Sequence, residues 1–390
     1  MHFHSRAVQK GAMAKKILII AGEASGDLHG GNLVQAIRTV DPSISFRGVG
    51  GVHMQEAGVE LLWNANGMGI VGLPGARRLF TILQVFRLVS ATLHSWQPDL
   101  VILIDYPEFN LTVAGKAKKL GIQVMYYISP QIWAWRSGRI NTISQRVDRM
   151  VVILPFEKAI YEKANVKVSF VGHPLLDVIR VKDEEAITRS HYLKNEASLL
   201  VGLLPGSRLS EISHLLPVML DAATIITREI SRVEFLVPLA STIRQEEVTS
   251  YLRGRDLNLT VVEGNTHEVI QVCEMIIAAS GTVTLEAAIL GTPLIVVYKV
   301  NPLTYWLGKR LVQVEHVALA NIVAGETVAP ELIQHEVTSE RIAQEAIGIL
   351  EDSKRQAWIR QRFSEVREKL GSPGASTRAA AIALELMGSG

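Results

Sequence analysis

Short, almost wholly apolar runs alternate with longer helical patterns along this chain, and the alternation restricts the fold more than any other feature. In the first half, these runs lie at residues 16–22, 45–49, 99–105, 122–128, 149–154 and 168–171. Strands that are apolar at consecutive positions are typical of a parallel sheet covered by helices on both faces. The first half therefore predicts a doubly wound α/β domain.

The same pattern restarts after residues 180–198, a charged stretch typical of a surface connection. Further apolar runs lie at residues 199–204, 233–237, 259–262, 275–279 and 293–297. The length of 390 residues also favours two or three domains. We therefore expect two tandem doubly wound, Rossmann-like domains that face a cleft, one at residues 13–178 and the other at residues 179–350.

The charge distribution argues against a nucleic-acid ligand. The net charge is +2, but the first sixteen residues hold four basic side chains and no acid. The rest of the chain therefore has 36 basic residues (40 less 4) against 38 acidic ones, whereas a nucleic-acid-binding domain usually has a basic excess. We expect no nucleic-acid partner, and we interpret residues 1–12 as an extension or tag remnant before a start at Met13.

The cysteine and hydropathy patterns indicate a reducing, cytoplasmic location. Cys273 is the one cysteine, which excludes an intrachain disulfide, and no Cys/His cluster has zinc spacing. Charged and polar residues interrupt each apolar stretch before about 18 residues, so we expect no membrane span. The N-terminal tail also lacks the apolar core of a signal peptide.

Two segments of the first half follow apolar runs and are rich in polar residues. Residues 22–31 (GEASGDLHGG) hold glycines that let backbone amides approach a ligand, but the segment matches neither the dinucleotide fingerprint nor the P-loop. The alternative is a tight strand–helix turn capped by Asp27. Asp105 ends the run at residues 99–105, and ligands of open α/β sheets gather at such strand ends. We favour Asp105 as a general base over a residue that only helps to start a helix at Pro107.

Two further segments have plainer interpretations. Residues 129–136 (SPQIWAWR) hold two of the six tryptophans, and a tryptophan pair can stack on a sugar or fill a core. Core filling is the commoner case. His173, near the expected domain crossing, is better interpreted as a hydrogen-bonded hinge residue than as a catalyst.

The second half repeats a strand-to-helix turn with anion-binding character. Arg208 follows Pro-Gly-Ser at a predicted helix N-terminus, a favourable place to hold a phosphate, although a surface arginine at a turn is the alternative. Ser280, Gly281 and Thr282 offer amides and hydroxyls to an anion in the next such turn. Glu286 lies one helical turn beyond Thr282, where it could accept hydrogen bonds from ribose hydroxyls.

Taken together and in this order, nine segments resemble the lipid-A-disaccharide synthase family. They are GEASGDLHG, MGIVG, DYPEFN, SPQIWAWR, LPFE, GHPL, LLPGSR, ASGTVTLE and NIVAG. The resemblance implies an inverting glycosyltransferase of the GT-B fold that joins UDP-2,3-diacylglucosamine to 2,3-diacylglucosamine 1-phosphate, forms a β-1,6-linked disaccharide 1-phosphate and releases UDP. The family usually has proline where this chain has Ala320.

The resemblance also implies roles for particular residues. Glu23 and Asp105 would be catalytic, with Asp105 as the base, and Arg208 and Asn321 would lie near the substrate phosphates. The nucleotide would lie on the residues predicted above from the second turn: Ser280, Gly281, Thr282 and Glu286. No Asp-x-Asp pair stands out at a strand end, so we expect no metal and no cofactor. Helices at residues 351–390 would return to the first domain, and a homodimer is left open.

Two rival functions fit the same architecture. One is a UDP-N-acetylglucosamine 2-epimerase, which would need no lipid acceptor. The other is a nucleotide-sugar sensor, which would bind UDP without turnover.

The segment at residues 68–75 (MGIVGLPG) is apolar and precedes a helical pattern that begins with Arg77 and Arg78. Spacing at 100° per residue predicts one face that packs on the sheet, made of Leu79, Ile82, Leu83, Phe86, Val89 and Leu93. Phe80, Val85 and Leu88 fall off that face. A buried helix with a few exposed apolar residues is one interpretation. The other is a patch at the inner-membrane surface, where acyl chains enter, made of Ile70, Val71, Phe80 and Leu88 beside Arg77 and Arg78.

Overall fold

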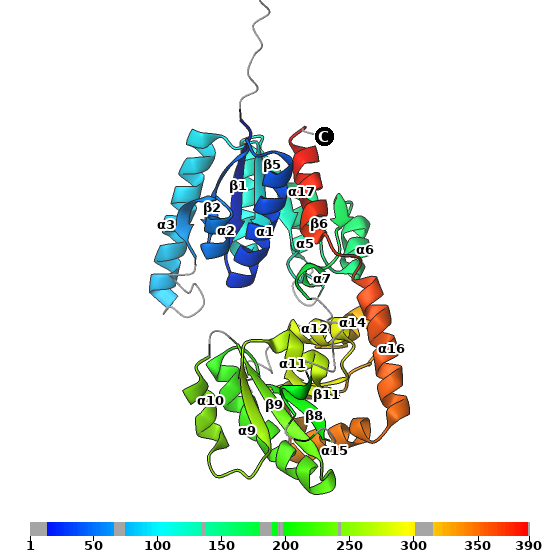
Figure 1. Ribbon diagram of the computed structural model, residues 1–390. Coiled ribbons are helices and arrows are strands. Elements are labelled where there is room, and N and C mark those ends of the chain that lie inside the picture. The colour runs from blue at the N-terminus through cyan, green and yellow to red at the C-terminus, as the bar shows by residue number, and fades with distance from the viewer. Residues whose placement is uncertain are drawn as a thin grey trace, which may run out of the picture.

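The structure is a computed structural model that describes residues 14–65, 75–133, 138–179, 189–193, 195, 198–240, 243–300 and 315–388. It has two α/β domains, one above the other in Figure 1, each built on a parallel sheet. The two-domain architecture expected from the sequence is therefore confirmed.

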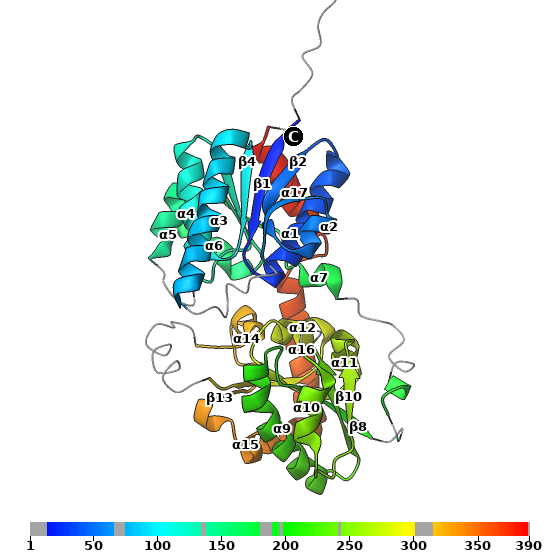
Figure 2. The ribbon, with the colours of Figure 1, turned by 90° about the vertical axis from the view of Figure 1, so that its left-hand side faces the viewer.

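The first sheet has seven strands, all paired in parallel. In spatial order they are β3 (Glu60–Asn64), β2 (Ser45–Gly50), β1 (Lys16–Ala21), β4 (Leu100–Ile104), β5 (Gln123–Tyr127), β6 (Arg149–Val152) and β7 (Val168–Phe170). On one face lie α1 (Ala24–Val40), α2 (Val52–Glu56), α7 (Leu175–Val178) and the C-terminal α17 (Ala375–Leu386). On the other lie α3 (Gly75–Trp96), α4 (Pro107–Lys119), α5 (Arg139–Arg146) and α6 (Pro155–Lys163) (Figure 2).

Strand β1 shows why the sequence is apolar at every position after Lys16. Successive side chains of a strand point to opposite faces of the sheet. Ile17 and Ile19 join the core beneath α1 and α17, whereas Leu18 and Ile20 join the core beneath α3 and α4. A central strand with helices on both sides buries both of its rows, so it tolerates few polar residues.

The second sheet repeats this order with six strands. They are β10 (Leu259–Glu263), β9 (Val233–Leu239), β8 (Leu199–Leu204), β11 (Met275–Ala279), β12 (Leu294–Tyr298) and β13 (Glu331–Ile333). Its helices are α9 (Leu209–Glu229), α10 (Gln245–Leu252), α11 (Thr266–Val272), α12 (Val283–Leu290), α14 (Leu319–Ala324), the 3-10 turn η1 (Gln334–Glu336), α15 (Ser339–Leu350) and α16 (Ser353–Lys369).

The chain passes between the domains twice, and the two crossings are joined. The amide of His173, in the first crossing, donates to the Leu370 carbonyl in the second over 2.9 Å. Gly172 and Gly371 have φ of 82° and 93°, and a Cβ on Gly371 would lie 3.2 Å from the Gly172 Cα. The hinge interpretation of His173 agrees with these contacts.

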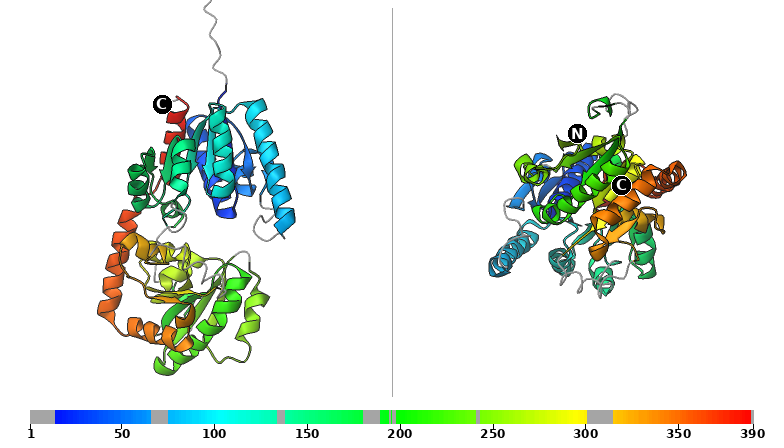
Figure 3. Two further views of the ribbon diagram at one scale, coloured as in Figure 1. Left: turned by 180° about the vertical axis from the view of Figure 1, so that it is seen from behind. Right: turned by 90° about the horizontal axis from the view of Figure 1, so that it is seen from below.

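The C-terminal helices divide between the domains. Helix α16 packs on α12 and α14 of the second domain, whereas α17 packs on α1 and β5 of the first (Figures 1 and 3). Only the end of the segment at residues 351–390 therefore lies on the first domain. The chain returns between α16 and α17.

Within the described residues, α9 is long and apolar enough to cross a membrane by length and composition alone. Its apolar side is already covered, because Ile212, Leu216, Leu220 and Ile226 belong to the core of the second domain. Packing on the sheet and α15 accounts for its hydropathy.

Candidate functional site

The backbone at the end of β4 is held in a left-handed conformation. Asp105 and Tyr106 have φ of 47° and 44°, a region that costs a non-glycine residue about 1–3 kcal/mol and occurs mainly at functional sites. The Asn110 amide Nδ2 donates to the Asp105 carbonyl over 2.7 Å, and the Tyr126 hydroxyl donates to the same oxygen. A Cβ at Gly22 would lie 2.7 Å from the Tyr106 ring, so the glycine allows the ring to pack there.

Burial and neighbouring carboxylates make Asp105 a stronger base than an ordinary aspartate. Burial raises the pKa of Asp105 to about 6, and the charges of Glu23 and Glu108 add to the increase. Glu23 is exposed at the N-cap of α1. The structure thus brings both predicted catalytic carboxylates to the same edge, where a base with a pKa near neutrality suits proton abstraction.

Asp27 bonds the start of α2 and does not cap the helix in which it lies. Its carboxylate accepts the Gly51 and Met54 amides over 2.6 and 3.1 Å and the His53 amide over 3.0 Å. It therefore caps the N-terminus of α2 from within α1, and the expectation that it caps α1 is wrong. The first loop is fixed through tertiary contacts that sequence spacing does not reveal.

A pocket of about 860 Å³ opens at the carboxyl ends of β8, β9, β10 and β11 in the second domain. It is lined in part by Arg208, Ser280, Gly281, Thr282 and Glu286, so the structure gathers the residues that the sequence assigned to the nucleotide. Val178 of α7, after the first sheet, also lines it. The pocket therefore faces the first domain.

The turn before α9 is built to present Arg208. Gly206 has φ of 115°, and a Cβ there would collide with the Glu211 carboxylate. That carboxylate accepts the Ser207 amide over 3.1 Å and pairs with the Arg208 guanidinium at 3.5 Å. The Arg208 side chain is 72% exposed, so a phosphate can approach it.

Helix α12 supplies the other wall of the pocket. Gly281 and Thr282 are exposed just before its first turn, where backbone amides have no partner within the helix. The Ser280 hydroxyl donates to the Val317 carbonyl over 3.2 Å. Burial raises the pKa of Glu286 to about 7.

His267 is a lining residue that the sequence analysis missed. Its Nε2 lies 3.7 Å from the Glu286 carboxylate, and burial lowers its pKa. It follows Asn265 and Thr266 directly after β10. Ligands of open α/β sheets gather at the carboxyl ends of strands. The position of this segment after β10 is therefore a sequence signal for a lining residue, as it was for Asp105.

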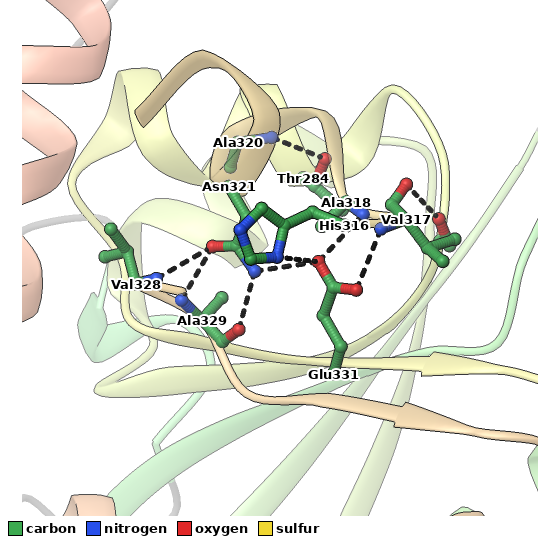
Figure 4. Close-up of polar contacts among 10 residues, drawn as sticks. Thr284, His316, Val317, Ala318, Ala320, Asn321, Val328, Ala329 and Glu331 are labelled. Atoms are coloured by element: carbon green, nitrogen blue, oxygen red, sulfur yellow. Dashed lines mark hydrogen bonds and ion pairs between the residues drawn. The ribbon is translucent and has the colours of Figure 1, made fainter. Parts of the chain in front are cut away.

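Asn321, which the resemblance placed near the substrate phosphates, has a side chain bonded wholly to protein groups. Its side chain is fully buried; Nδ2 donates to the Ala329 carbonyl and to Glu331 Oε1, each over 2.8 Å (Figure 4). Its Oδ1 accepts the amides of Val328 and Ala329 over 3.0 and 2.9 Å. With these groups committed, the side chain has none left for a substrate phosphate.

The Asn321 network supports the nucleotide side of the pocket instead. The Glu331 carboxylate also accepts the amides of Val317 and Ala318 over 2.8 and 3.0 Å. Val317 in turn receives the Ser280 hydroxyl. Asn321 and Glu331 therefore fix the segment against which the Ser280 turn rests.

The tryptophan segment and LPFE meet in the core of the first domain. Glu157 is buried and accepts hydrogen bonds from the Ser129 hydroxyl and from Trp133 Nε1, the latter over 3.3 Å. Burial raises the pKa of Glu157 to about 7. Trp133 packs edge-on against Phe156 with ring centroids 5.1 Å apart, which agrees with core filling. Residues 134–137 lie outside the described residues.

Sequence comparisons match nearly the whole chain to one family. A family model described as lipid-A-disaccharide synthetase matches residues 17–386. The lipid-A-disaccharide synthase of Syntrophus aciditrophicus is 50% identical over 376 residues, which cover 96% of this chain and 98% of that protein. That of Trichlorobacter lovleyi is 46% identical over 374 residues, with the same coverage.

Solved structures with little sequence identity share the fold. A putative UDP-N-acetylglucosamine 2-epimerase from Listeria monocytogenes has a TM-score of 0.66 at 12% identity, covering 96% of each chain. MurG of Acinetobacter baumannii has a TM-score of 0.59 at 15% identity, covering 95% of this chain and 99% of that one. They support the GT-B architecture, and the sequence relatives decide the family. This chain belongs to the lipid-A-disaccharide synthase family.

Proposed function

We propose that this enzyme transfers 2,3-diacylglucosamine from its UDP donor to 2,3-diacylglucosamine 1-phosphate, forming the β-1,6-linked disaccharide 1-phosphate and UDP. The observation that carries the proposal is the pairing of two strand-end sites. One holds a carboxylate with a pKa of about 6, and the other is a pocket lined by an exposed arginine and the start of a helix. The first suits a base and the second a diphosphate.

Asp105 acts as the general base. Its carboxylate takes the proton from the acceptor 6-hydroxyl while that oxygen bonds to the donor anomeric carbon. The bond from that carbon to the diphosphate oxygen breaks on the opposite face, which inverts the configuration. Glu23 supports the step by raising the pKa of Asp105.

The second domain stabilises the leaving group. Negative charge accumulates on the diphosphate as the bond breaks, and fixed donors aimed at such charge lower the barrier. Arg208 and the backbone amides of Gly281 and Thr282, just before α12, supply these donors, and the Glu286 carboxylate accepts from the ribose. The reaction is expected to need no metal, and turnover that stays unchanged in excess chelator checks this.

Helix α3 packs with most of the face that its spacing predicted, since Ile82, Phe86, Val89 and Leu93 join the core. The prediction is wrong at three positions. Val85 is 3% exposed, although it was expected off the packed face, whereas Leu79 and Leu83 are 60% and 47% exposed. Phe80 and Leu88, expected off that face, are 61% and 36% exposed. The helix runs past the end of the sheet (Figure 2), so its first turns have less of the sheet to cover them.

Leu79, Phe80, Leu83 and Leu88 form the apolar part of a membrane-facing surface on the first domain. Exposed apolar side chains on the same helix as a basic residue, here Arg87, suit the headgroup boundary of an anionic bilayer. The enzyme would thus lie at the cytoplasmic face of the inner membrane, where acylated substrates are embedded. Ile70 and Val71, and the side chains of Arg77 and Arg78, lie outside the described residues.

Vesicle binding tests the membrane proposal. Replacing Phe80, Leu83 and Leu88 by serine should reduce sedimentation with anionic vesicles and leave UDP affinity intact. A matched triple change of exposed Gln35, Thr39 and Lys119 to serine serves as the control. Undiminished binding after the apolar changes would move the entry point for acyl chains elsewhere.

One assay separates the proposed reaction from its rivals. The acylated UDP donor is incubated with the enzyme, with and without the acylated 1-phosphate acceptor. Disaccharide that appears only with acceptor supports the transferase. Epimerised sugar without acceptor would support the epimerase, and UDP binding without any turnover would support the sensor.

A further inference from the structure

Arg139 begins α5, the helix that follows the tryptophan segment. Its guanidinium forms an ion pair with Glu108 in the first turn of α4. The arginine side chain is 16% exposed, whereas that of Glu108 is 54% exposed. The cation is therefore held mostly covered, and its partner is open to solvent.

Two observations connect Arg139 to the end of β4. Burial raises the pKa of Tyr126 well above its usual range, and the charge of Arg139 acts in the opposite direction, so the guanidinium lies within electrostatic reach of that hydroxyl. The hydroxyl donates to the Asp105 carbonyl. Glu108, the ion-pair partner, is among the charges that raise the pKa of Asp105.

The charge of this edge is unfavourable for the acceptor unless a cation is present. Glu23, Asp105 and Glu108 place carboxylates around the point where the 6-hydroxyl must lie. The acceptor carries its phosphate at C1, one sugar ring away from that hydroxyl. Within the part of the chain that the structure describes, Arg139 is the cation that its ion pair with Glu108 connects to the Asp105 edge.

We infer that Arg139 binds the acceptor 1-phosphate and thereby fixes which end of the acceptor sugar faces Asp105. The inference rests on the proposed function, since it takes the acceptor from there. On binding, the guanidinium exchanges the Glu108 carboxylate for the phosphate. The Glu108 side chain is 54% exposed, so its carboxylate can be solvated by water once the phosphate has replaced it. The planar guanidinium can meet two phosphate oxygens at once.

This assignment gives each domain its own phosphate ligand. Arg208 in the second domain faces the donor diphosphate, and Arg139 in the first faces the acceptor monophosphate. A purely structural ion pair between α4 and α5 is the alternative, and it makes no distinction between acceptors with and without a phosphate.

A comparison of two acceptors tests the inference. Arg139→Ala and the wild type are assayed with 2,3-diacylglucosamine 1-phosphate and with the same sugar lacking the phosphate. Loss of one charge-assisted contact corresponds to about a ten- to hundredfold higher KM for the phosphorylated acceptor. The unphosphorylated acceptor should show the same KM with both proteins. Equal losses on both acceptors, or no loss on either, would overturn the inference.

Two further variants guard against a folding artefact. Arg139→Lys keeps the charge but not the planar fork, so its KM should lie between those of the wild type and the alanine variant. Glu108→Gln removes the competing carboxylate, so binding of the phosphorylated acceptor should tighten several-fold. Looser or unchanged binding in Glu108→Gln would count against the exchange. Lys158→Ala, which breaks an exposed pair with Glu162 on α6, is the control and should match the wild type.

Calorimetry distinguishes failure of this inference from failure of the proposed function. Titration of the enzyme with the phosphorylated acceptor needs no turnover. If the wild type makes no disaccharide, the proposed function fails, yet weaker binding by Arg139→Ala would still support Arg139 as the phosphate ligand. If the wild type is active and both proteins bind the acceptor equally, the inference alone fails.

Discussion

The two sheets have the same strand order but finish their central strands in different ways. In the first domain, β4 runs into Asp105 and Tyr106, two non-glycine residues with positive φ. In the second domain, β8 runs into Gly206, which takes a φ of 115° without a side chain to strain. The first edge presents carboxylates, and the second presents backbone amides and Arg208.

This difference separates chemistry from binding. A strained, half-buried carboxylate sits in a defined position at the cost of backbone strain, which suits a proton transfer with strict geometry. An anion needs only donors and positive charge, which a glycine turn and a helix start provide with little strain. We therefore expect changes at the first edge to affect rate, and changes at the second to affect UDP affinity.

The largest effect is expected from Asp105→Asn. The substitution is nearly isosteric, so the backbone network around Asn110 and Tyr126 should persist. Loss of a general base typically lowers the rate about a hundredfold to ten-thousandfold. The kcat at saturating substrates should fall by this amount, while calorimetry should give an unchanged Kd for UDP.

Asp99→Asn is the matched control, because Asp99 lies at the other end of β4 and accepts the Lys16 amide over 2.7 Å. It should leave kcat within a few-fold of the wild type. Wild-type turnover by Asp105→Asn would show that Asp105 is not the base. The division between a catalytic edge in the first domain and a binding edge in the second would then be wrong.

The next largest effect is expected from Arg208→Ala, measured as the Kd for UDP. Removing a charge-assisted contact should weaken binding about ten- to a hundredfold. Arg244→Ala is a close control. Arg244 also stands at a helix N-cap and pairs with the glutamate three residues further on, Glu247, at 3.3 Å. It is not among the residues that line the pocket. Equal effects of the two changes would show that Arg208 acts through its helix.

Asn321→Ala should act on stability before it acts on ligands. The change leaves the Val328 and Ala329 amides without their buried acceptor, and unsatisfied buried groups cost about 1–3 kcal/mol. Chemical denaturation should show a reduced free energy of unfolding. Gln356→Ala, which removes a half-buried amide bonded to the Ile349 and Leu350 carbonyls, should cost less. A stable Asn321→Ala protein with weak UDP binding would restore the ligand role.

The sequence predicted the order of strands and helices and the strand-end residues, because both follow local patterns. It predicted four of the six core-facing positions of α3 but not the exposure of Leu79 and Leu83, because spacing along a helix does not show how far the sheet beneath it extends. It also did not predict the hydrogen-bond partners of Asp27 and Asn321. Asp27 bonds backbone amides 24 to 27 residues away, and Asn321 bonds backbone groups 7 and 8 residues away and the Glu331 side chain. Such contacts follow from folding in three dimensions.

The smallest effects, and the most specific, concern pH. Asp105 must be ionised to accept a proton, so kcat should rise as pH increases through its pKa of about 6 and level off above it. Glu286 must be ionised to accept well from the ribose, so UDP affinity should rise through its pKa of about 7. His267 lies 3.7 Å away, and burial lowers its pKa, so it is neutral over this range.

The two profiles are therefore displaced from one another. Between pH 7 and 8, UDP affinity should still improve by a small factor while kcat stays constant. Glu286→Gln should flatten the affinity profile and leave the kcat profile as it was. Coincident profiles would mean that one group governs both, and the division between a catalytic edge and a binding edge would fail.

Because burial raises both carboxyl pKa values above their ordinary ones, their ionisation also destabilises the fold as pH rises. As pH rises through these two pKa values, the enzyme thus gains activity while the ionisation of Asp105 and Glu286 lowers the free energy of unfolding.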